Sequence, residues 1–135
     1  MSGVPDVEFI ANAGACLAST NVLSRAGRVR WMVREVPAAP ADSGWRIFSQ
    51  LDSDEYLADP ANVQVVGFNQ VCMIEPALIG IYDLPGGSDL QIVDDGHRMA
   101  VVDTPTGREL GENELYVPGD PVRDWGAATP RPHRP

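Results

Sequence analysis

Residues 29–60, VRWMVREVPAAPADSGWRIFSQLDSDEYLADP, contain the clearest signals for the fold that we expect of this chain. Residues 29–35 are rich in β-branched and aromatic side chains and contain no glycine or proline, which predicts a strand. The prolines of residues 37–40 cannot continue a ladder, because proline has no backbone donor. Residues 42–44, Asp-Ser-Gly, are typical of a turn, and residues 45–49 resume as a second strand. The stretch therefore predicts an antiparallel hairpin with a long loop.

Side-chain alternation assigns the residues of this hairpin to two faces. The first strand groups Val29, Trp31 and Val33 against Arg30, Met32 and Arg34, and the second groups Trp45 and Ile47 against Arg46 and Phe48. The three arginines are expected either to pair with the acidic segment that follows or to contact a partner. Exposed ion pairs of the first kind contribute only about 0–1 kcal/mol each.

The acidic end of the stretch, residues 51–60, predicts a short helix that ends before Pro60. Asp52 and Glu55 have the spacing of a capping box, with Asp in the place of the usual Ser or Thr. Asp52, Glu55 and Asp59 are three and four residues apart, so they share one side of the predicted helix. Three interpretations stay open: carboxylates favoured by the helix dipole, an acidic surface that docks a basic partner, or a catalytic carboxylate pair, although no neighbouring residue suggests a substrate or a metal.

The whole chain has 135 residues and a formal net charge of −9 at pH 7, with 44% hydrophobic and 21% charged residues. This length predicts one domain that folds without disulfides or metal. The acidic balance argues against binding to nucleic acid or to anionic membranes, and it favours basic partners. Asp6 and Glu8 stand where a signal peptide needs positive charge, and no apolar run approaches about 18 residues. We therefore expect a cytoplasmic protein with no nucleic-acid or membrane partner.

Residues suited to catalysis or metal binding are few. Cys16 and Cys72 lie in the apolar runs GACLA and VCMI, which predicts buried free thiols in a reducing compartment. A disulfide is the alternative, because sequence does not establish their distance. His97 has no second His or paired Cys in ligand spacing, and neither GxxxxGK[ST] nor GxGxxG occurs. We expect no enzyme activity, no cofactor and no metal.

The remaining strands are predicted from short apolar runs. Residues 14–20 form a first strand, and residues 21–27 form a short helix or loop. Residues 63–68, VQVVGF, are rich in valine and are predicted to form a central strand. Residues 90–93 and 98–102 flank an Asp-Gly pair, which is a hairpin signal that places His97 near the tip.

Residues 69–81 predict a helix with Asn69 as its N-cap and an interruption at Pro76. Apolar residues recur at helical spacing and define its core face: Met73, Ile74, Ala77, Leu78 and Ile81. Residues 118–135 contain five prolines, which predicts an irregular or disordered tail with Trp125 as a candidate anchor.

Together these elements predict an α+β fold. We expect a single domain over residues 7–117, with an antiparallel sheet of about five or six strands and about two or three short helices. The tail of residues 118–135 lies outside this domain.

Several segments of the sequence, in their order and spacing, resemble a bacterial family, immunity protein 33, also described as domain of unknown function 2185. The matching segments are ACLAS at 15–19, VRWMVREVP at 29–37, DSGWRIFSQ at 42–50, DEYLADPANV at 54–63, and Asn69 with Glu75 and Pro76 downstream. Asp-Ser-Gly-Trp-Arg at 42–46 is the most specific match. The sequence departs from the pattern at Gln50 and Leu51, where glycine and an acid are expected, and at the Gly86-Gly87 loop.

The resemblance implies an immunity protein of a bacterial polymorphic-toxin system, which neutralises a cognate toxin by stoichiometric binding, and it brings no catalytic residues. Such binding is compatible with charge complementarity that accelerates encounter and with aromatic and arginine anchors. The candidate partner-binding residues are Trp45, Arg46, Asp52, Asp54, Glu55, Tyr56 and Asp59. Core packing and a structural ion pair are the ordinary alternative for Trp45 and Arg46.

Two other classes of function stay open at this point. A small regulatory or ligand-binding module would use a hairpin face with Trp31 and Trp45 to line an apolar pocket. A small enzyme would need His97, Asp94 or Cys72 to meet in one site, since a nucleophilic cysteine requires a positioned base.

Overall fold

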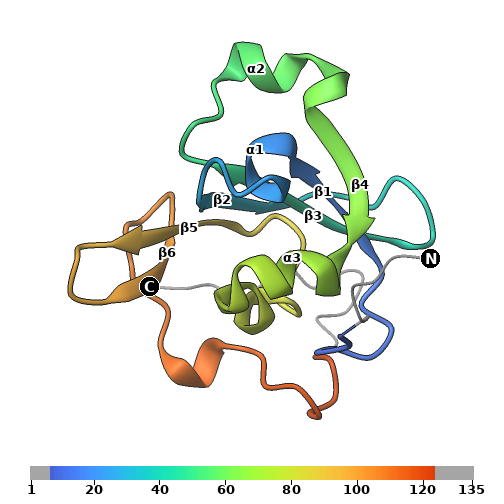
Figure 1. Ribbon diagram of the computed structural model, residues 1–135. Helices are drawn as coiled ribbons and strands as arrows, with labels where there is room; N and C mark the ends of the chain where they lie inside the picture. Colours follow the sequence, from blue (N-terminus) through green and yellow to red (C-terminus); the bar gives the residue numbers. More distant parts are fainter. Residues whose placement is uncertain (1–6, 124–135) are drawn as a thin grey trace.

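Six strands form one sheet with the order β4-β1-β3-β2-β5-β6 in the computed structural model, which describes residues 7–123 (Figure 1). The strands are β1 Ala15–Ser19, β2 Val29–Arg34, β3 Asp42–Ser49, β4 Val63–Gly67, β5 Asp89–Asp94 and β6 Met99–Asp103. The α-helices are α1 Thr20–Leu23, α2 Asp54–Ala58 and α3 Phe68–Ile74, and the 3₁₀ turns are η1 Pro60–Asn62, η2 Pro76–Ile81 and η3 Glu112–Glu114. The predicted α+β class is confirmed.

The predicted hairpin is present, since β2 and β3 pair in antiparallel fashion. The expectation of an antiparallel sheet is wrong in one place, because β1 runs parallel to β3 and the sheet is therefore mixed. The chain leaves β1 through α1 and crosses over, so that β2 lies two strands away and β3 fills the position between them. Turn signals in a sequence reveal pairing between consecutive strands only, which is why this pair was missed.

β4 pairs with β1 and forms one edge of the sheet. The prediction that residues 63–68 form a central strand is therefore wrong. Val65 in the middle of β4 is 72% exposed. β-Branched residues fit a pleated surface, so the run was correctly identified as a strand, but its composition does not fix its place in the sheet.

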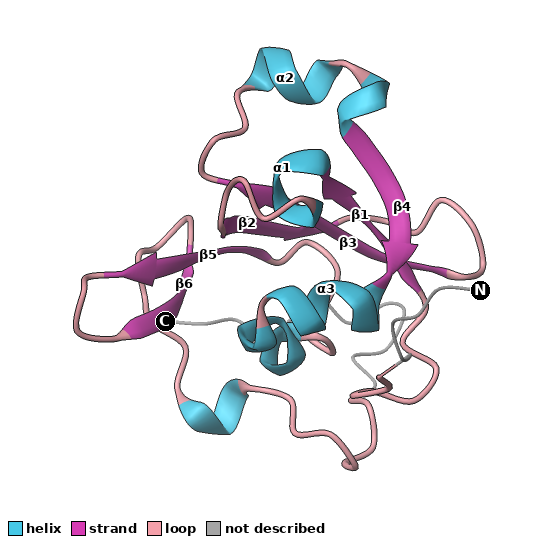
Figure 2. Cartoon of the chain, viewed as in Figure 1, coloured by secondary structure: helices cyan, strands magenta, loops and turns pink. Residues whose placement is uncertain are grey.

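One face of the sheet carries the hydrophobic core, and α1, α3 and η2 pack on this face (Figure 2). The strands contribute Met32, Trp45, Ile47 and Leu90, and the helical segments contribute Val22, Phe68, Val71, Cys72, Leu78 and Ile81, all of them fully buried. Full burial of a large apolar side chain stabilises a fold by roughly 1.5–3 kcal/mol. Burial of these side chains therefore supplies most of the free energy that stabilises the packing of the helical layer on the sheet.

The two tryptophans of the hairpin lie on opposite faces of the sheet. Trp31 stands opposite Phe48 in the ladder, whereas Trp45 stands opposite Arg34, and residues that stand opposite each other share a face. The predicted grouping of Val29 with Trp31 is wrong, because the register shifts between them. Such a β-bulge re-aims one side chain, and it turns Val29 toward the core.

The helix caps differ from those predicted. α2 begins after Ser53, whose hydroxyl accepts a hydrogen bond from the Tyr56 N–H at 3.0 Å, so Asp52 is not the cap. α3 begins after Gly67. The Asn69 side chain instead forms hydrogen bonds with the segment that precedes β1: its Oδ1 accepts from the N–H groups of Phe9 and Ile10, and its Nδ2 donates to the Ile10 carbonyl.

Other local predictions are confirmed or modified in detail. β1 and the short helix α1 are present, and β5 and β6 form the predicted hairpin. Pro76 ends the α-helix and begins η2. This interruption changes the helical phase, so Leu78 and Ile81 are buried whereas Met73 is 38% exposed and does not share their face.

After β6 the chain first folds back along that strand. Leu115 and Tyr116 then lie against Gly80 of η2, and Arg123 binds Asp83. Its Nε donates to the Asp83 carboxylate at 2.8 Å, and the Asp83 side chain is only 1% exposed. Burial opposes ionisation of Asp83, but the hydrogen bonds from Arg123 outweigh it and hold the pKa below its ordinary value. Trp125, the candidate anchor of the tail, lies outside the described residues.

Candidate functional site

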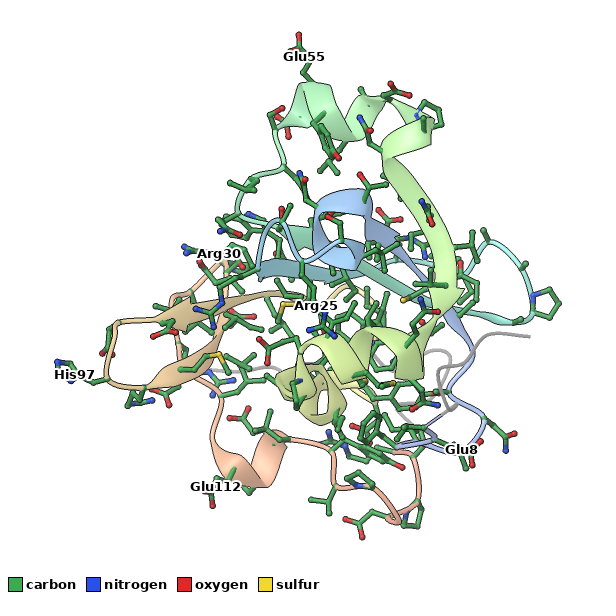
Figure 3. All side chains as sticks on the ribbon, in the orientation of Figure 1. Glu8, Arg25, Arg30, Glu55, His97 and Glu112 are labelled. Carbon is green, nitrogen blue, oxygen red and sulfur yellow. The ribbon has the colours of Figure 1, made fainter. Side chains whose placement is uncertain are left out.

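The acidic segment, residues 52–59, links the end of β3 to η1 and β4. Asp54, Glu55 and Asp59 are exposed, and Glu55 points away from the rest of the molecule at the tip of α2 (Figure 3). Within residues 7–123, none of these three carboxylates takes part in an ion pair. Their charge is therefore presented to solvent.

Asp52 and Tyr56 attach the acidic segment to the body of the domain. Asp52 accepts hydrogen bonds from the Ser49 N–H at 2.6 Å and from the Asn21 side chain at 2.8 Å. Burial alone would raise the pKa of Asp52, but hydrogen bonds from serine and asparagine groups outweigh it and lower the pKa. The Tyr56 hydroxyl is hydrogen bonded to the Thr20 hydroxyl. These two predicted site residues therefore hold the acidic segment in place, and its solvent-facing carboxylates are those of Asp54, Glu55 and Asp59.

Trp45 and Arg46 lie inside the domain. Trp45 is fully buried, and its Nε1 donates to the carbonyl of Tyr82 at 3.0 Å. Arg46 is 6% exposed, and its guanidinium donates to the carboxylates of Asp42 and Glu35. In this conformation neither side chain offers a contact surface to a partner.

The prediction that the hairpin arginines pair with the acidic segment is wrong. Arg46 has the two partners just named, and Arg30 donates to the Gln91 side chain at 2.8 Å. Arg34 donates to the backbone carbonyl of Ser43 beside the hairpin loop, and to those of Tyr82 and Leu84 before β5. These partners lie within the sheet and the loops beside it, and the Nε of Arg30 is buried without a hydrogen-bond partner among the described residues.

Residues 42–46, Asp-Ser-Gly-Trp-Arg, form a bulge inside β3, although a turn was predicted at residues 42–44 and a strand only from residue 45. The register with β1 shifts here, since Ala15 stands opposite Asp42 and Leu17 opposite Arg46. The Asp42 carboxylate accepts from the Gly44 N–H at 2.8 Å and from both Nη atoms of Arg46 at 3.0 and 2.9 Å. The hydrogen bonds from Arg46 hold the pKa of Asp42 well below its ordinary value. The most specific motif of the sequence therefore builds the sheet.

An aromatic patch on the open face of the sheet was missed as a candidate site. It consists of Trp31 and Phe48, which are partly exposed and stand opposite each other, and of Arg30, whose guanidinium lies 5.0 Å from the centre of the Trp31 ring. Strand alternation separates Trp31 from Met32, but it groups Met32 with two arginines, so it does not reveal that Met32 faces the core and Trp31 the open face. A pocket lined by both Trp31 and Trp45 is not formed, since the two side chains are on opposite faces.

The candidate catalytic residues do not form a reactive site. Cys16 and Cys72 are buried free thiols, as predicted, and burial raises the pKa of each to about 12, so both stay protonated at neutral pH. His97 is exposed in the turn between β5 and β6 (Figure 3), far from the buried layer that holds Cys72. No three His, Cys, Asp or Glu side chains of the described residues are arranged to hold a metal ion. Within the same residues no helix has the length and apolar character to cross a bilayer.

Comparison with known proteins assigns the chain to a family. A family model described as the immunity protein Imm33 domain matches residues 16–102, whereas searches of curated proteins and of solved structures found no significant match. The matched region begins in β1 and ends in β6, so it takes in the bulge of β3, the acidic segment and the aromatic patch. It covers well over half of the sequence. The chain therefore belongs to the Imm33 immunity protein family.

Proposed function

We propose that this protein is the immunity component of a bacterial polymorphic-toxin system and that it neutralises a cognate toxin in the cytoplasm. The observation that carries the proposal is the Imm33 domain over residues 16–102. The protein acts by stoichiometric binding and without turnover, in keeping with two cysteines that are buried and protonated at neutral pH.

The charged part of the toxin-binding surface is the acidic segment. Asp54, Glu55 and Asp59 are exposed and form no ion pair within the described chain, and the whole chain carries a net charge of −9. Complementary charge steers two proteins together and raises the association rate. A basic surface on the toxin therefore fits this segment.

The candidate anchor is the aromatic patch. Tryptophan and arginine carry much of the energy of protein interfaces, and Arg30 stacked on the partly exposed Trp31 provides both residue types at the surface. Trp45 and Arg46 support binding by maintaining the sheet on which this patch lies.

Co-expression with the toxin encoded by the adjacent gene tests the proposal. We expect the protein to restore growth of cells that produce the toxin, and we expect the purified pair to form a complex with one immunity protein per toxin in isothermal titration calorimetry. Failure to bind the toxin, or failure to restore growth at equal expression, would remove the immunity function.

A further inference from the structure

The two edges of the sheet differ in their protection. At the β6 edge the chain folds back and covers the strand. The Asp103 N–H donates to the Arg108 carbonyl at 2.8 Å, and the Leu110 N–H donates to the Val101 carbonyl at 2.9 Å. At the β4 edge the sequence VQVVG has no charge, no proline and no register shift, although natural edge strands usually carry such devices against pairing. β4 therefore has the character of a pairing site.

The hydrogen-bond phase of β4 follows from its neighbours. The Phe68 N–H donates to the Gly14 carbonyl, and the Ala15 N–H donates to the Ala41 carbonyl. The backbone hydrogen-bonding groups of Ala15 therefore face β3 and not β4. Bonded and non-bonded pairs alternate along an antiparallel ladder, and Ala15 stands opposite Gly67. The backbone groups of Val63, Val65 and Gly67 therefore point away from β1, toward the open edge.

Two of these outward groups already have partners within the chain. The Val63 N–H donates to Pro60, and the Gly67 carbonyl occupies the N-cap position of α3, where it accepts the first helical hydrogen bond. No described strand lies beyond β4 in the sheet order. The groups that remain for a neighbour are the carbonyl of Val63, the N–H and carbonyl of Val65, and the N–H of Gly67.

We propose that β4 pairs with β4 of a second copy of this chain, antiparallel and about a two-fold axis at Val65. In that register Val65 and the partner's Val65 exchange both hydrogen bonds, and the Gly67 N–H donates to the carbonyl of the partner's Val63. In this register the Val63 N–H of one copy faces the Gly67 carbonyl of the other copy. Both of these groups already have hydrogen-bond partners within their own chain. The remaining set is thus self-complementary, as an isologous interface requires.

Charge sets the conditions for this association. β4 is uncharged, and the two-fold axis sends the two acidic segments to opposite ends of the paired strands. Each copy nevertheless carries a net charge of −9, so two copies repel at long range and salt screens that repulsion. Added salt therefore strengthens the pairing of two copies, whereas it weakens the binding of a basic partner to the acidic segment.

Sedimentation velocity on the full chain, over a concentration series at low and high salt, tests the proposal. We expect a monomer–dimer equilibrium that shifts toward dimer as salt increases. Val65→Pro removes an N–H that points away from β1, a position at which an edge strand tolerates proline, and it should weaken association by about tenfold or more. Val65→Lys should act similarly through charge at the axis. Val36→Lys is the matched control at a loop valine that is 87% exposed.

Disulfide formation tests the register. Oxidised Val65→Cys should give a covalent dimer across the axis, faster than Gln64→Cys, whose neighbour in the partner strand is Val66, and faster than Val36→Cys. Circular dichroism of each variant establishes that it is folded. A wild-type chain that stays monomeric at every concentration overturns the proposal, and so does a folded Val65→Lys variant that dimerises like wild type. Loss of toxin binding in Val65→Lys without any dimer in the wild type would assign the edge to the toxin and likewise overturn it.

Discussion

Arg46 and Asp42 form an ion pair across a bulge in the second strand of the hairpin. Both Nη atoms of Arg46 donate to the Asp42 carboxylate, at 3.0 and 2.9 Å, and the side chains are 7% and 14% exposed. The pair spans the point where β3 shifts its register against β1. The motif that suggested a partner-binding anchor therefore has a structural function, because it keeps β3 paired with both of its neighbours.

Removing the charge of Asp42 should destabilise the fold. Asp42→Asn weakens the paired hydrogen bonds to Arg46, and we expect a loss of about 1–3 kcal/mol in the free energy of unfolding measured with urea. Asp54→Asn, at an exposed carboxylate, is the control and should change stability by no more than about 0.5 kcal/mol. Equal effects of the two substitutions would contradict the role of the bulge.

The same pair should make stability depend on pH in acid. The folded pKa of Asp42 lies below its ordinary value, so its contribution is complete above the unfolded pKa of about 3.9 and is lost as the pH falls through the folded pKa. Asp52 and Asp83 are shifted in the same direction. The wild-type chain should therefore lose more stability than Asp42→Asn on acidification below about pH 4. Parallel stability curves for the two proteins would exclude Asp42 as a contributor.

Gly44 should not tolerate alanine. Its φ is +89°, and an added Cβ would lie 2.3 Å from the carbonyl oxygen of Glu35. We expect Gly44→Ala to reduce the free energy of unfolding by at least about 2 kcal/mol, through backbone strain and overpacking together. Gly87→Ala separates the two effects, since Gly87 has a φ of +90° with no atom near its Cβ position, and it should cost about 1 kcal/mol. A Gly44→Ala loss no larger than that would show that the Glu35 contact is unimportant.

Charge reversal in the acidic segment should slow toxin association. We expect Asp54→Lys with Glu55→Lys to lower the association rate by about tenfold or more at low salt, because it removes steering of a basic partner, with little change in the dissociation rate. The difference in association rate between this variant and the wild type should become smaller as the salt concentration rises. The pair Glu112→Lys with Asp120→Lys makes the same change of charge at exposed residues elsewhere. Equal slowing by both pairs, in stopped-flow measurements, would indicate an effect of net charge without a docking surface.

The two tryptophans of the hairpin should separate binding from stability. Trp45→Phe removes a buried hydrogen bond to the Tyr82 carbonyl and should cost about 1–2 kcal/mol of stability, with unchanged toxin affinity of the folded protein. Trp31→Ala should cost less stability and weaken toxin binding by about 2 kcal/mol. Calorimetric titration and urea unfolding of both variants measure the two effects. Weaker binding in Trp45→Phe alone would place the anchor in the core.

The features that the amino-acid sequence predicts correctly are local ones or ones shared with a family. β-Branched and aromatic runs predicted the strands, prolines at 37, 40, 60 and 76 predicted where elements stop, and an Asp-Gly pair predicted the β5–β6 hairpin. The Asp-Ser-Gly-Trp-Arg motif indicated the Imm33 family, which the family model confirmed. These signals act within a few residues, so they need no knowledge of what packs on them.

The neighbours of each strand and the exposure of its side chains depend on the three-dimensional fold. The parallel pairing of β1 with β3, the edge position of β4, and the separation of Trp31 from Trp45 arise from contacts between segments distant in sequence. Such contacts depend on how register and bulges bring apolar side chains to one face, where burial is favourable. A local pattern contains the side chains that take part, but it does not contain the partner that buries them or leaves them exposed.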